Sequence, residues 1–376
     1  MTRECDYLIV GSGIAGASVA YHLAPRGTVI ILEREDQPGY HSTGRSAAVF
    51  AESYGPRLMR VMTMASGDFL RRPPDGFAST PLMHPRGALF VARADQREFL
   101  EELVKELSEL SDSIKLVSVD AALALCPVLK KSYVAAAAHD PSVMDMDVNA
   151  IHQGYLRGSR AKGATIVTNA EVTAFGRKNG KWLCETRAGA FAAPVVIDAA
   201  GAWADVIADL AGVRRIGLQP KRRTVIIFDA PHGTNFAKSP VAADCAEQFY
   251  FKPESGRVLA SPADETPVEP QDIQPDELDV ALVVDRIEKA STLKVGRILR
   301  RWAGLRSFVQ DKNPVVGFAP DAEGFFWLAG QGGYGIQTSY AMGLTAASLA
   351  AGLGLPDAVK GYGIGENDLG PARLWA

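Results

Sequence analysis

The chain has 376 residues, of which 47% are hydrophobic, so it can bury a large core and we expect two domains. Its net charge of −3 lacks the basic excess of nucleic-acid-binding proteins, so no nucleic-acid partner is expected. Four cysteines lie far apart without a CxxC pair, which predicts neither a disulfide framework nor a metal site. No apolar stretch is long enough to predict a secretory signal or a membrane span. We expect a cytoplasmic protein, with peripheral membrane attachment left open.

The N-terminal segment YLIVGSGIAGASVAYHLA indicates a strand over Tyr7–Val10, a glycine turn and a helix. In dinucleotide-binding folds, glycines at this spacing permit the turn, the approach of a pyrophosphate and close packing of helix on strand. A second strand, TVIILE, ends at Glu33, where an acid can accept hydrogen bonds from an adenosine ribose. The segment predicts an ADP-binding unit for FAD or NAD, with a ligand-free turn as the alternative. The residues expected to line it are Gly11, Gly13, Ile14, Ala15, Gly16, Glu33 and Arg34.

A polar loop follows Glu33, where a plain NAD dehydrogenase would be expected to continue toward a third parallel strand. The loop contains HSTGRSAA, whose hydroxyl and backbone donors suit a long, buried dinucleotide. The residues expected near its phosphates are Ser42, Thr43, Arg45, Ser46 and Ala47.

The rest of the chain alternates between segments that belong to this nucleotide unit and segments that do not. PVVIDAAGAWAD indicates a buried strand ending in a glycine turn, and Val172, Ala200 and Gly201 are expected near the cofactor. GALFVA, RTVIIF and QFYFKP indicate strands of a separate sheet. We therefore expect an α/β fold in which residues 1–54, 145–212 and 310–376 form a discontinuous Rossmann-like domain. Residues 55–144 and 213–309 would form an α+β substrate domain on a mixed or antiparallel sheet.

A second turn, LAGQGGYGIQTS, repeats the glycine spacing near the end of the chain. It indicates a strand, a glycine turn and a helix, but no strand ending in an acid follows. A second dinucleotide site is therefore not expected.

These motifs, with QPKRR and WAGLRSF between them, resemble the D-amino acid oxidase-like (DAO) flavoproteins. That family includes glycine oxidase, sarcosine oxidase and the bacterial D-amino acid dehydrogenases, and the likeness is greatest to those acting on D-arginine. The resemblance implies one noncovalent FAD, with the second glycine turn at its flavin ring. There a helix N-terminus would stabilise the negative charge of the reduced ring. The residues implied at this end are Gly330, Gly332, Gly333, Tyr334, Gly335, Ile336 and Gln337.

The resemblance also implies a reaction, the oxidative deamination of D-amino acids to 2-oxo acids and ammonia. No acid–base catalyst is expected, because the flavin carries the chemistry. Arg223 and Arg306 would bind the substrate carboxylate through their planar guanidinium forks. The other residues implied around the substrate are Tyr54, Tyr250, Gly333 and Gln337. The electron acceptor stays open between a quinone, a dye-like acceptor and O₂.

Two positions depart from the D-arginine enzymes, since Val49 replaces a histidine and Ala88 replaces an acid. The missing acid favours a substrate with a neutral side chain, unless Glu52, Asp244 or Glu247 substitutes for it. His41 could contact FAD, be linked to it covalently, or be an ordinary loop residue.

Three other functions compete with D-amino acid oxidation. A 2-hydroxy acid dehydrogenase would use the same arginines but would need a base, such as a histidine, near them. A glycine or secondary amine oxidase of the same family would differ only in substrate. A flavin-binding interaction protein would need no second glycine turn and no paired arginines.

Overall fold

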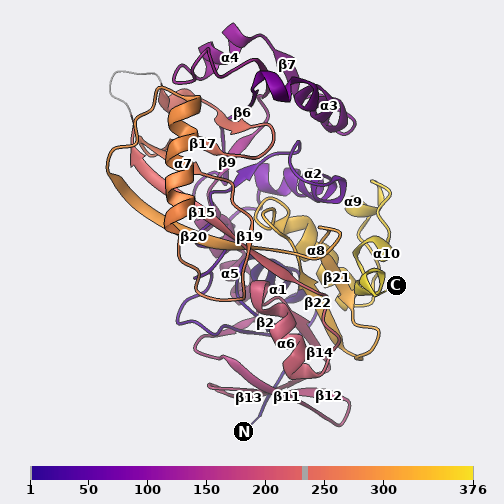
Figure 1. Cartoon of the computed structure of the whole chain (residues 1–376). Coiled ribbons are helices and arrows are strands. Elements are labelled where there is room, and N and C mark those ends of the chain that lie inside the picture. Colours follow the sequence, from indigo (N-terminus) through magenta and orange to yellow (C-terminus); the bar gives the residue numbers. More distant parts are fainter. Residues whose placement is uncertain (1, 231–235, 376) are drawn as a thin grey trace.

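A six-stranded sheet lies in the lower half of the computed structural model, which describes residues 2–230 and 236–375 (Figure 1). Five neighbouring strands run parallel, and the edge strand β21 is antiparallel to β22. The parallel strands are short apolar runs, as expected where both faces of a sheet are covered. In spatial order the strands are β10 (Thr165–Val167), β3 (Val29–Leu32), β2 (Tyr7–Val10), β14 (Val195–Asp198), β22 (Phe325–Ala329) and β21 (Val315–Phe318).

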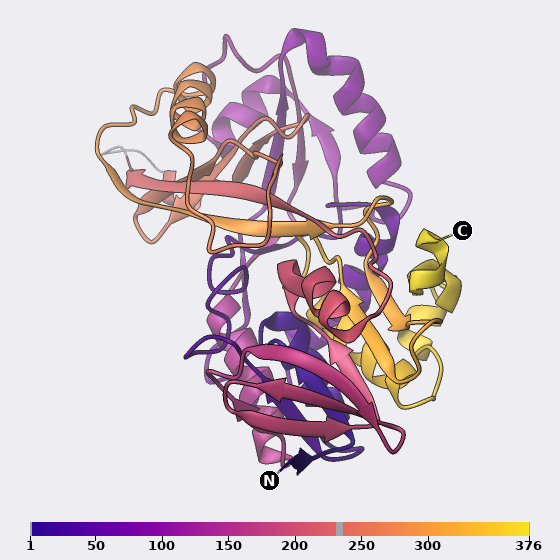
Figure 2. The same ribbon diagram turned by 60° about the horizontal axis from the view of Figure 1, so that its bottom comes forward.

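Different elements cover the two faces of this sheet. One face packs against α1 (Ile14–Leu23), α5 (Val148–Ala161) and α8 (Ser339–Ala350). The other packs against α6 (Ala204–Ala211) and a four-stranded sheet, seen at the bottom of Figure 2. The strands of that sheet are β1 (Arg3–Glu4), β13 (Gly189–Ala193), β12 (Lys181–Thr186) and β11 (Val172–Lys178).

A nine-stranded, mostly antiparallel sheet forms the upper half of the molecule. Only its β16–β6 pair is parallel among the described strands. Three helices pack against this sheet: α3 (Arg97–Leu107), α4 (Val119–Leu125) and α7 (Glu277–Ala290). Its strands are β19 (Thr266–Pro267), β15 (Gln219–Asp229), β18 (Arg257–Ser261), β17 (Tyr250–Glu254), β16 (Val241–Asp244), β6 (Ala88–Ala92), β8 (Ala136–Asp140), β7 (Lys115–Val117) and β20 (Ile298–Phe308).

The strands β15 and β20 form a long antiparallel ribbon that crosses the molecule between its two halves (Figure 2). Arg223 pairs with Gly304, and Arg306 pairs with Lys221, so both expected carboxylate ligands lie on this ribbon. The ribbon places them at the boundary between the two large sheets.

Smaller elements connect the two halves. A three-stranded sheet contains β4 (Val49–Phe50), β9 (Met144–Met146) and β5 (Met83–Pro85). The helix α2 (Arg57–Arg71) packs against α8 and against α9 (Asp357–Lys360). The remaining elements are α10 (Glu366–Leu369) and short 3₁₀ helices at Ala94–Gln96, Gly201–Trp203, Phe236–Lys238 and Pro371–Leu374.

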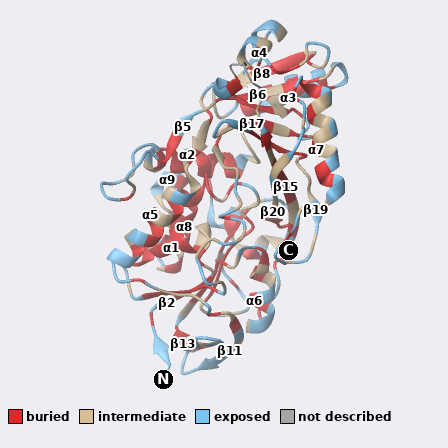
Figure 3. Ribbon diagram, turned by 90° about the vertical axis from the view of Figure 1, so that its left-hand side faces the viewer, coloured by how far each residue is buried: buried red, intermediate tan, exposed pale blue. Residues whose placement is uncertain are grey.

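Buried residues concentrate in the sheets and on the helix faces turned toward them (Figure 3). Strands from residues 1–54, 145–212 and 310–376 build the six- and four-stranded sheets, while those of the nine-stranded sheet come from residues 88–140 and 219–308. The expected fold class, an α/β nucleotide-binding unit with a second, mixed-sheet unit, is confirmed. The exact domain boundaries stay a prediction. None of the described helices is both long enough and apolar enough to cross a membrane.

The helix expected after the second glycine turn does not follow it directly. Gly330 and Gly332 adopt left-handed backbone angles, with φ of 75° and 55°, which interrupts a helix. A series of turns follows, and α8 begins only at Ser339. The expected helix N-terminus at Gly330–Gly335 is therefore replaced by irregular backbone.

Candidate functional site

A long cleft runs from the carboxyl ends of the parallel strands to the β15–β20 ribbon. Ligands bind at such strand ends in open α/β sheets. Most of the residues expected from the sequence line this cleft, whereas Gly16, Tyr54, Tyr334 and Gln337 do not. Those lining it are Gly11, Gly13, Ile14, Ala15, Glu33, Arg34, Ser42, Thr43, Arg45, Ser46, Ala47, Val172, Ala200, Gly201, Arg223, Tyr250, Arg306, Gly330, Gly332, Gly333, Gly335 and Ile336.

The first glycine turn brings β2, α1 and the segment after β14 into close contact. A Cβ on Gly11, whose φ is 97°, would lie 2.6 Å from the carbonyl oxygen of Ala199. A Cβ on Gly16 would lie 1.9 Å from the carbonyl oxygen of Gly11. Gly16 therefore allows helix and strand to pack, and does not itself face the cleft.

Glu33 is buried at the end of β3, beside this turn. Its Oε2 accepts hydrogen bonds from the backbone N–H (3.1 Å) and hydroxyl (2.5 Å) of Ser12. Its Oε1 accepts one from the N–H of Glu35 (3.0 Å). Because each carboxylate oxygen offers about two lone pairs, acceptor capacity remains for a ribose hydroxyl. The position and chemistry of Glu33 fit the adenosine end of a dinucleotide.

The HSTGR loop closes over the other side of the turn. Thr43 Oγ1 accepts a hydrogen bond from Ile14 N (2.9 Å) at the start of α1. The hydroxyl of Ser42 donates to the carbonyl oxygen of Leu305 (2.8 Å), on β20. The hydroxyl of Ser46 donates to the carbonyl oxygen of Ser42 (2.8 Å). The loop is thus bonded both to the nucleotide turn and to the ribbon.

Arg45 was expected near the phosphates, but its guanidinium has other partners. It donates to the carbonyl oxygens of Ile273 (3.1 Å) and Ala303 (3.2 Å) and pairs with Asp272 (2.5 Å). Arg45 therefore connects the loop to the segment around Asp272 and to β20, and its charge is paired within the protein.

His41 lies at the adenosine end of the cleft. Its Nε2 is 2.8 Å from Glu35 Oε1, and its ring centroid is 4.6 Å from that of Trp203. Arg34 also lies over Trp203, at 5.0 Å. His41 is therefore held between Glu35 and Trp203 in the wall of the cleft.

The sequence did not identify several residues that line the cleft. On α6, Val206 and Leu210 are 42% and 38% exposed, and both face the cleft together with Trp203. Their i,i+4 spacing on a helix that follows a glycine turn was the available signal. Such an exposed apolar surface is what the adenine of a dinucleotide would cover.

Arg306 dominates the ribbon end of the cleft. Its Nη1 donates to the hydroxyl of Tyr54 (3.1 Å), and a Cβ on Gly333 would lie 2.6 Å from its Cζ. Burial opposes the charged form, but the hydroxyls of Tyr54 and Tyr250 favour it and raise the pKa of Arg306 above its ordinary value. Among the described residues no carboxylate forms an ion pair with Arg306. Its charge is available to an anion in the cleft.

Arg223, in contrast, already has protein partners. Its Nε donates to the carbonyl oxygen of Asp264 (2.9 Å) and its Nη2 to Glu265 (3.3 Å). Burial opposes ionisation of Glu265, but Lys221 and Arg223 hold the pKa of that carboxyl below its usual value. The two arginines are therefore not equivalent.

Tyr54 and Tyr334 lie next to Arg306, and Gln337 is a separate buried residue shortly before α8. The Tyr54 and Tyr334 ring centroids are 5.0 Å apart, and burial raises the pKa of Tyr334, so it is a neutral phenol. The Oε1 of Gln337 accepts from Ala51 N (3.1 Å). Its buried Nε2 has no partner among the described residues and remains a free donor.

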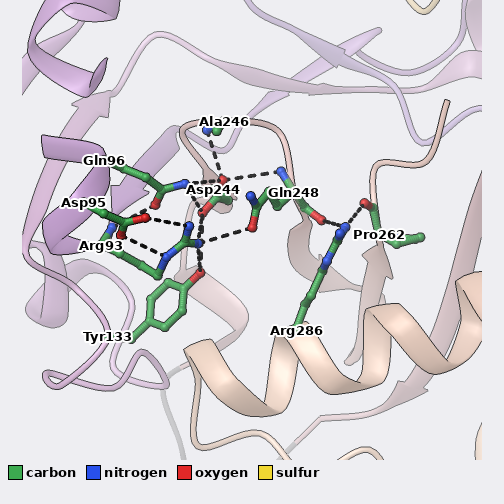
Figure 4. A network of polar contacts seen from close by, with 9 residues as sticks. All are labelled: Arg93, Asp95, Gln96, Tyr133, Asp244, Ala246, Gln248, Pro262 and Arg286. Atoms are coloured by element: carbon green, nitrogen blue, oxygen red, sulfur yellow. Dashed lines mark hydrogen bonds and ion pairs between the residues drawn. The ribbon is translucent and has the colours of Figure 1, made fainter. Parts of the chain in front are cut away.

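The structure accounts for two of the three acids that could replace the one missing at Ala88. Glu52 pairs with Arg71 (2.9 Å). Asp244 is 1% exposed and bonded to Arg93, Gln96, Tyr133 and nearby backbone (Figure 4). Glu247 is exposed in the following turn. Ala88 itself packs in an apolar cluster with Val49, Phe90, Tyr54 and Tyr250.

Comparisons with known proteins agree with this geometry. The family model "FAD dependent oxidoreductase" (DAO) matches residues 6–349. The chain belongs to the DAO family of FAD-dependent oxidoreductases. FAD dependent oxidoreductase domain-containing protein 1 of Xenopus laevis is 27% identical over 92% of this chain and 79% of its own length.

Two solved structures share the fold of this chain over 93% of its length. Glycine oxidase from Geobacillus kaustophilus is 21% identical, with a TM-score of 0.80 over 93% of this chain and 95% of its own. L-α-glycerophosphate oxidase from Mycoplasma pneumoniae, with FAD bound, is 20% identical, with a TM-score of 0.82 over 93% and 95%. These likenesses establish the fold, and a specific closeness to the D-arginine dehydrogenases stays a prediction.

The cofactor of this DAO protein is FAD. The residues that fit its adenosine end are the Gly11–Gly16 turn, Glu33 and α6. The second glycine turn, next to Arg306, fits the flavin end. Within residues 2–230 and 236–375, no group of three or more His, Cys, Asp or Glu side chains is arranged to hold a metal ion.

Proposed function

We propose that this FAD-dependent oxidoreductase oxidatively deaminates a D-amino acid. When bound, FAD accepts the hydride released from the substrate Cα, leaving an imino acid that water hydrolyses to a 2-oxo acid and ammonia. The amine must be neutral when the hydride leaves, because its lone pair forms the C=N bond. The D configuration rests on the resemblance of the motifs to the D-amino acid dehydrogenases.

The observation that carries this proposal is the environment of Arg306. A partly buried guanidinium that pairs with no carboxylate among the described residues, beside the second glycine turn, is suited to a bidentate pair with a substrate carboxylate. Its contact with Gly333 would place that carboxylate next to the backbone expected at the flavin ring. The residues of the chain therefore bind and orient the substrate, and orientation contributes much of the rate.

The surroundings of Ala88 support a substrate with a neutral side chain. Ala88 is 7% exposed and lies among apolar and aromatic side chains, and Glu52 and Asp244 are paired elsewhere. A cationic side chain placed there would lose its hydration without gaining a charge-assisted hydrogen bond. Oxidation of D-arginine remains the alternative, for which Glu247 would have to supply the acid.

A 2-hydroxy acid is the second candidate substrate, since the same arginine would bind its carboxylate. Removing the hydroxyl proton would require a base near Arg306. None of the described histidines is hydrogen-bonded to Arg306; His41 is bonded to Glu35 and His152 to the nucleotide turn. A glycine or secondary amine oxidase would share the whole arrangement and differ only in the side-chain pocket. Both of these enzymes would reduce the bound flavin with a substrate, whereas a flavin-binding interaction protein would not.

Anaerobic bleaching of the bound flavin tests these alternatives directly. The panel contains neutral D-amino acids, their L-enantiomers, D-arginine, D-lysine, glycine, sarcosine and 2-hydroxy acids. We expect the fastest bleaching with a neutral D-amino acid. Fastest bleaching by D-arginine or D-lysine would overturn the side-chain assignment. Fastest bleaching by a 2-hydroxy acid would overturn amine oxidation, and no bleaching by any member would favour the interaction protein.

A further inference from the structure

His152 is a buried histidine behind the dinucleotide turn, on α5, and the reaction does not use it. It is 4% exposed, and its Nε2 lies 2.8 Å from the carbonyl oxygen of Ser12. Because a carbonyl oxygen only accepts, Nε2 carries the proton. Burial lowers the pKa of His152, so the ring is neutral near pH 7 and its donor tautomer is fixed by this bond.

The same ring also supports Gly39, which leads into HSTGR (residues 41–45) and accepts a hydrogen bond from Gly44 N (2.8 Å). Gly39 has a φ of 79°, and a Cβ at that position would lie 2.8 Å from His152 Cε1. The backbone of Gly39 therefore rests directly on the imidazole. His152 contacts both segments that enclose the nucleotide end of the cleft, the turn through Ser12 and the loop through Gly39.

These two contacts fix groups that face the cofactor. The N–H and hydroxyl of Ser12 hold Glu33, the acid that fits the ribose. Farther along the HSTGR loop, Thr43 accepts from Ile14 N at the start of α1. A displacement of either backbone segment would therefore move the ribose acid or the phosphate-facing end of α1.

We propose that His152 is a positioning residue for FAD binding. Its Nε2–H bond to Ser12 and its ring contact with Gly39 hold the nucleotide turn and the loop that carries HSTGR in fixed positions relative to each other. It would touch no substrate. The proposal depends on FAD as cofactor and not on the choice of substrate, so it can fail while the proposed reaction stands.

The test measures FAD binding to the apoprotein by quenching of flavin fluorescence, without any substrate. His152→Leu removes the donor while keeping a buried apolar side chain. His152→Gln places an amide N–H about where Nε2 lies, and His152→Asn carries the same amide on a side chain one methylene shorter. Tyr155→Phe is the control, because Tyr155 is buried on the same helix and its hydroxyl bonds only Ser339 (3.2 Å) among the described residues.

We expect the FAD Kd to rise about tenfold in His152→Leu and His152→Asn, to stay within about threefold in His152→Gln, and to be unchanged in Tyr155→Phe. The recovery by glutamine distinguishes a positioned donor from mere filling of the core. Equal Kd values for the glutamine and asparagine variants would overturn the proposal, as would a leucine variant that binds FAD like the unchanged protein. If the leucine variant does not fold, the glutamine–asparagine pair still decides.

Discussion

Arg306 and Arg223 carry the same charge on the same ribbon, but their surroundings differ. Arg223 is bonded to Glu265 and to a backbone carbonyl, whereas Arg306 contacts a phenol and a glycine. A charge that has a partner within the protein has less to gain from a substrate. Substrate binding should therefore depend more strongly on Arg306.

We expect Arg306→Leu to lower kcat/KM by roughly 30- to 5000-fold, the equivalent of about 2–5 kcal/mol for a lost charged partner. FAD content should be unchanged. The measurements are steady-state kinetics on the best substrate and the flavin absorbance of the purified variant. Arg223→Leu serves as the comparison and should cost less, because Lys221 still pairs with Glu265 (2.9 Å). Equal losses of kcat/KM in the two variants would show that both arginines contribute equally to substrate binding.

His41 provides a second prediction at this scale. Its Nε2 is already engaged by Glu35, so we expect His41 to form no covalent link to the flavin. Precipitation of the protein with acid should therefore release all the yellow colour into the supernatant. Colour that stays with the pellet, and that His41→Ala releases, would show that a link exists.

At the level of elements, the sequence predicted the strands and turns that depend only on neighbouring residues. The strands β2, β3 and β14 are continuous apolar runs, and the first glycine turn between β2 and α1 has the expected shape. Their recognition needed only neighbouring residues, because strand burial and tight turns leave a local pattern.

The sequence could not predict contacts between distant segments. Asp272, which takes the charge of Arg45, lies 227 residues away in the chain. The pairing of Arg223 with Glu265, 42 residues along the chain, likewise depends on tertiary packing. The sequence therefore identified the residues that gather around the cleft, but not which of them keep a free charge there.

The second glycine turn offers a matched pair of substitutions. Gly333→Ala would place a methyl group 2.6 Å from Arg306 Cζ, so the guanidinium must shift. Gly335→Ala would place one 3.4 Å from a methyl carbon of Ile14, which is an ordinary contact. We expect Gly333→Ala to raise KM about tenfold or more, and Gly335→Ala, which also lines the cleft, to raise KM less, with both variants measured at saturating FAD. Kinetics that do not distinguish the two variants would show that Arg306 does not act from this position.

On the scale of the whole molecule, His22 should make stability depend on pH. It is buried on α1 between Tyr21 and Tyr340, and its Nε2 has no hydrogen-bond partner in the described part of the chain. Burial, with smaller contributions from Arg26 and Lys162, lowers its pKa from 6.5 to about 3. Between these values the unfolded chain binds a proton that the folded chain does not.

Because the unfolded chain binds the extra proton, acid lowers the free energy of unfolding through His22. The contribution of His22 to stability is complete above pH 6.5 and is lost progressively as the pH falls toward 3, by an amount on the order of 4 kcal/mol.

Carboxyl groups titrate in the same range, so the variant His22→Phe isolates this contribution. It removes the titrating group but keeps an aromatic ring beside Tyr21 and Tyr340. Urea unfolding at pH 7 and pH 4.5 should show a smaller loss of unfolding free energy for His22→Phe than for the unchanged protein. The exposed His84, replaced by glutamine, is the control and should leave the loss as it was. If His22→Phe loses as much stability on acidification as the unchanged protein, then His22 is already protonated in the folded state, and its side chain must reach water or an acid.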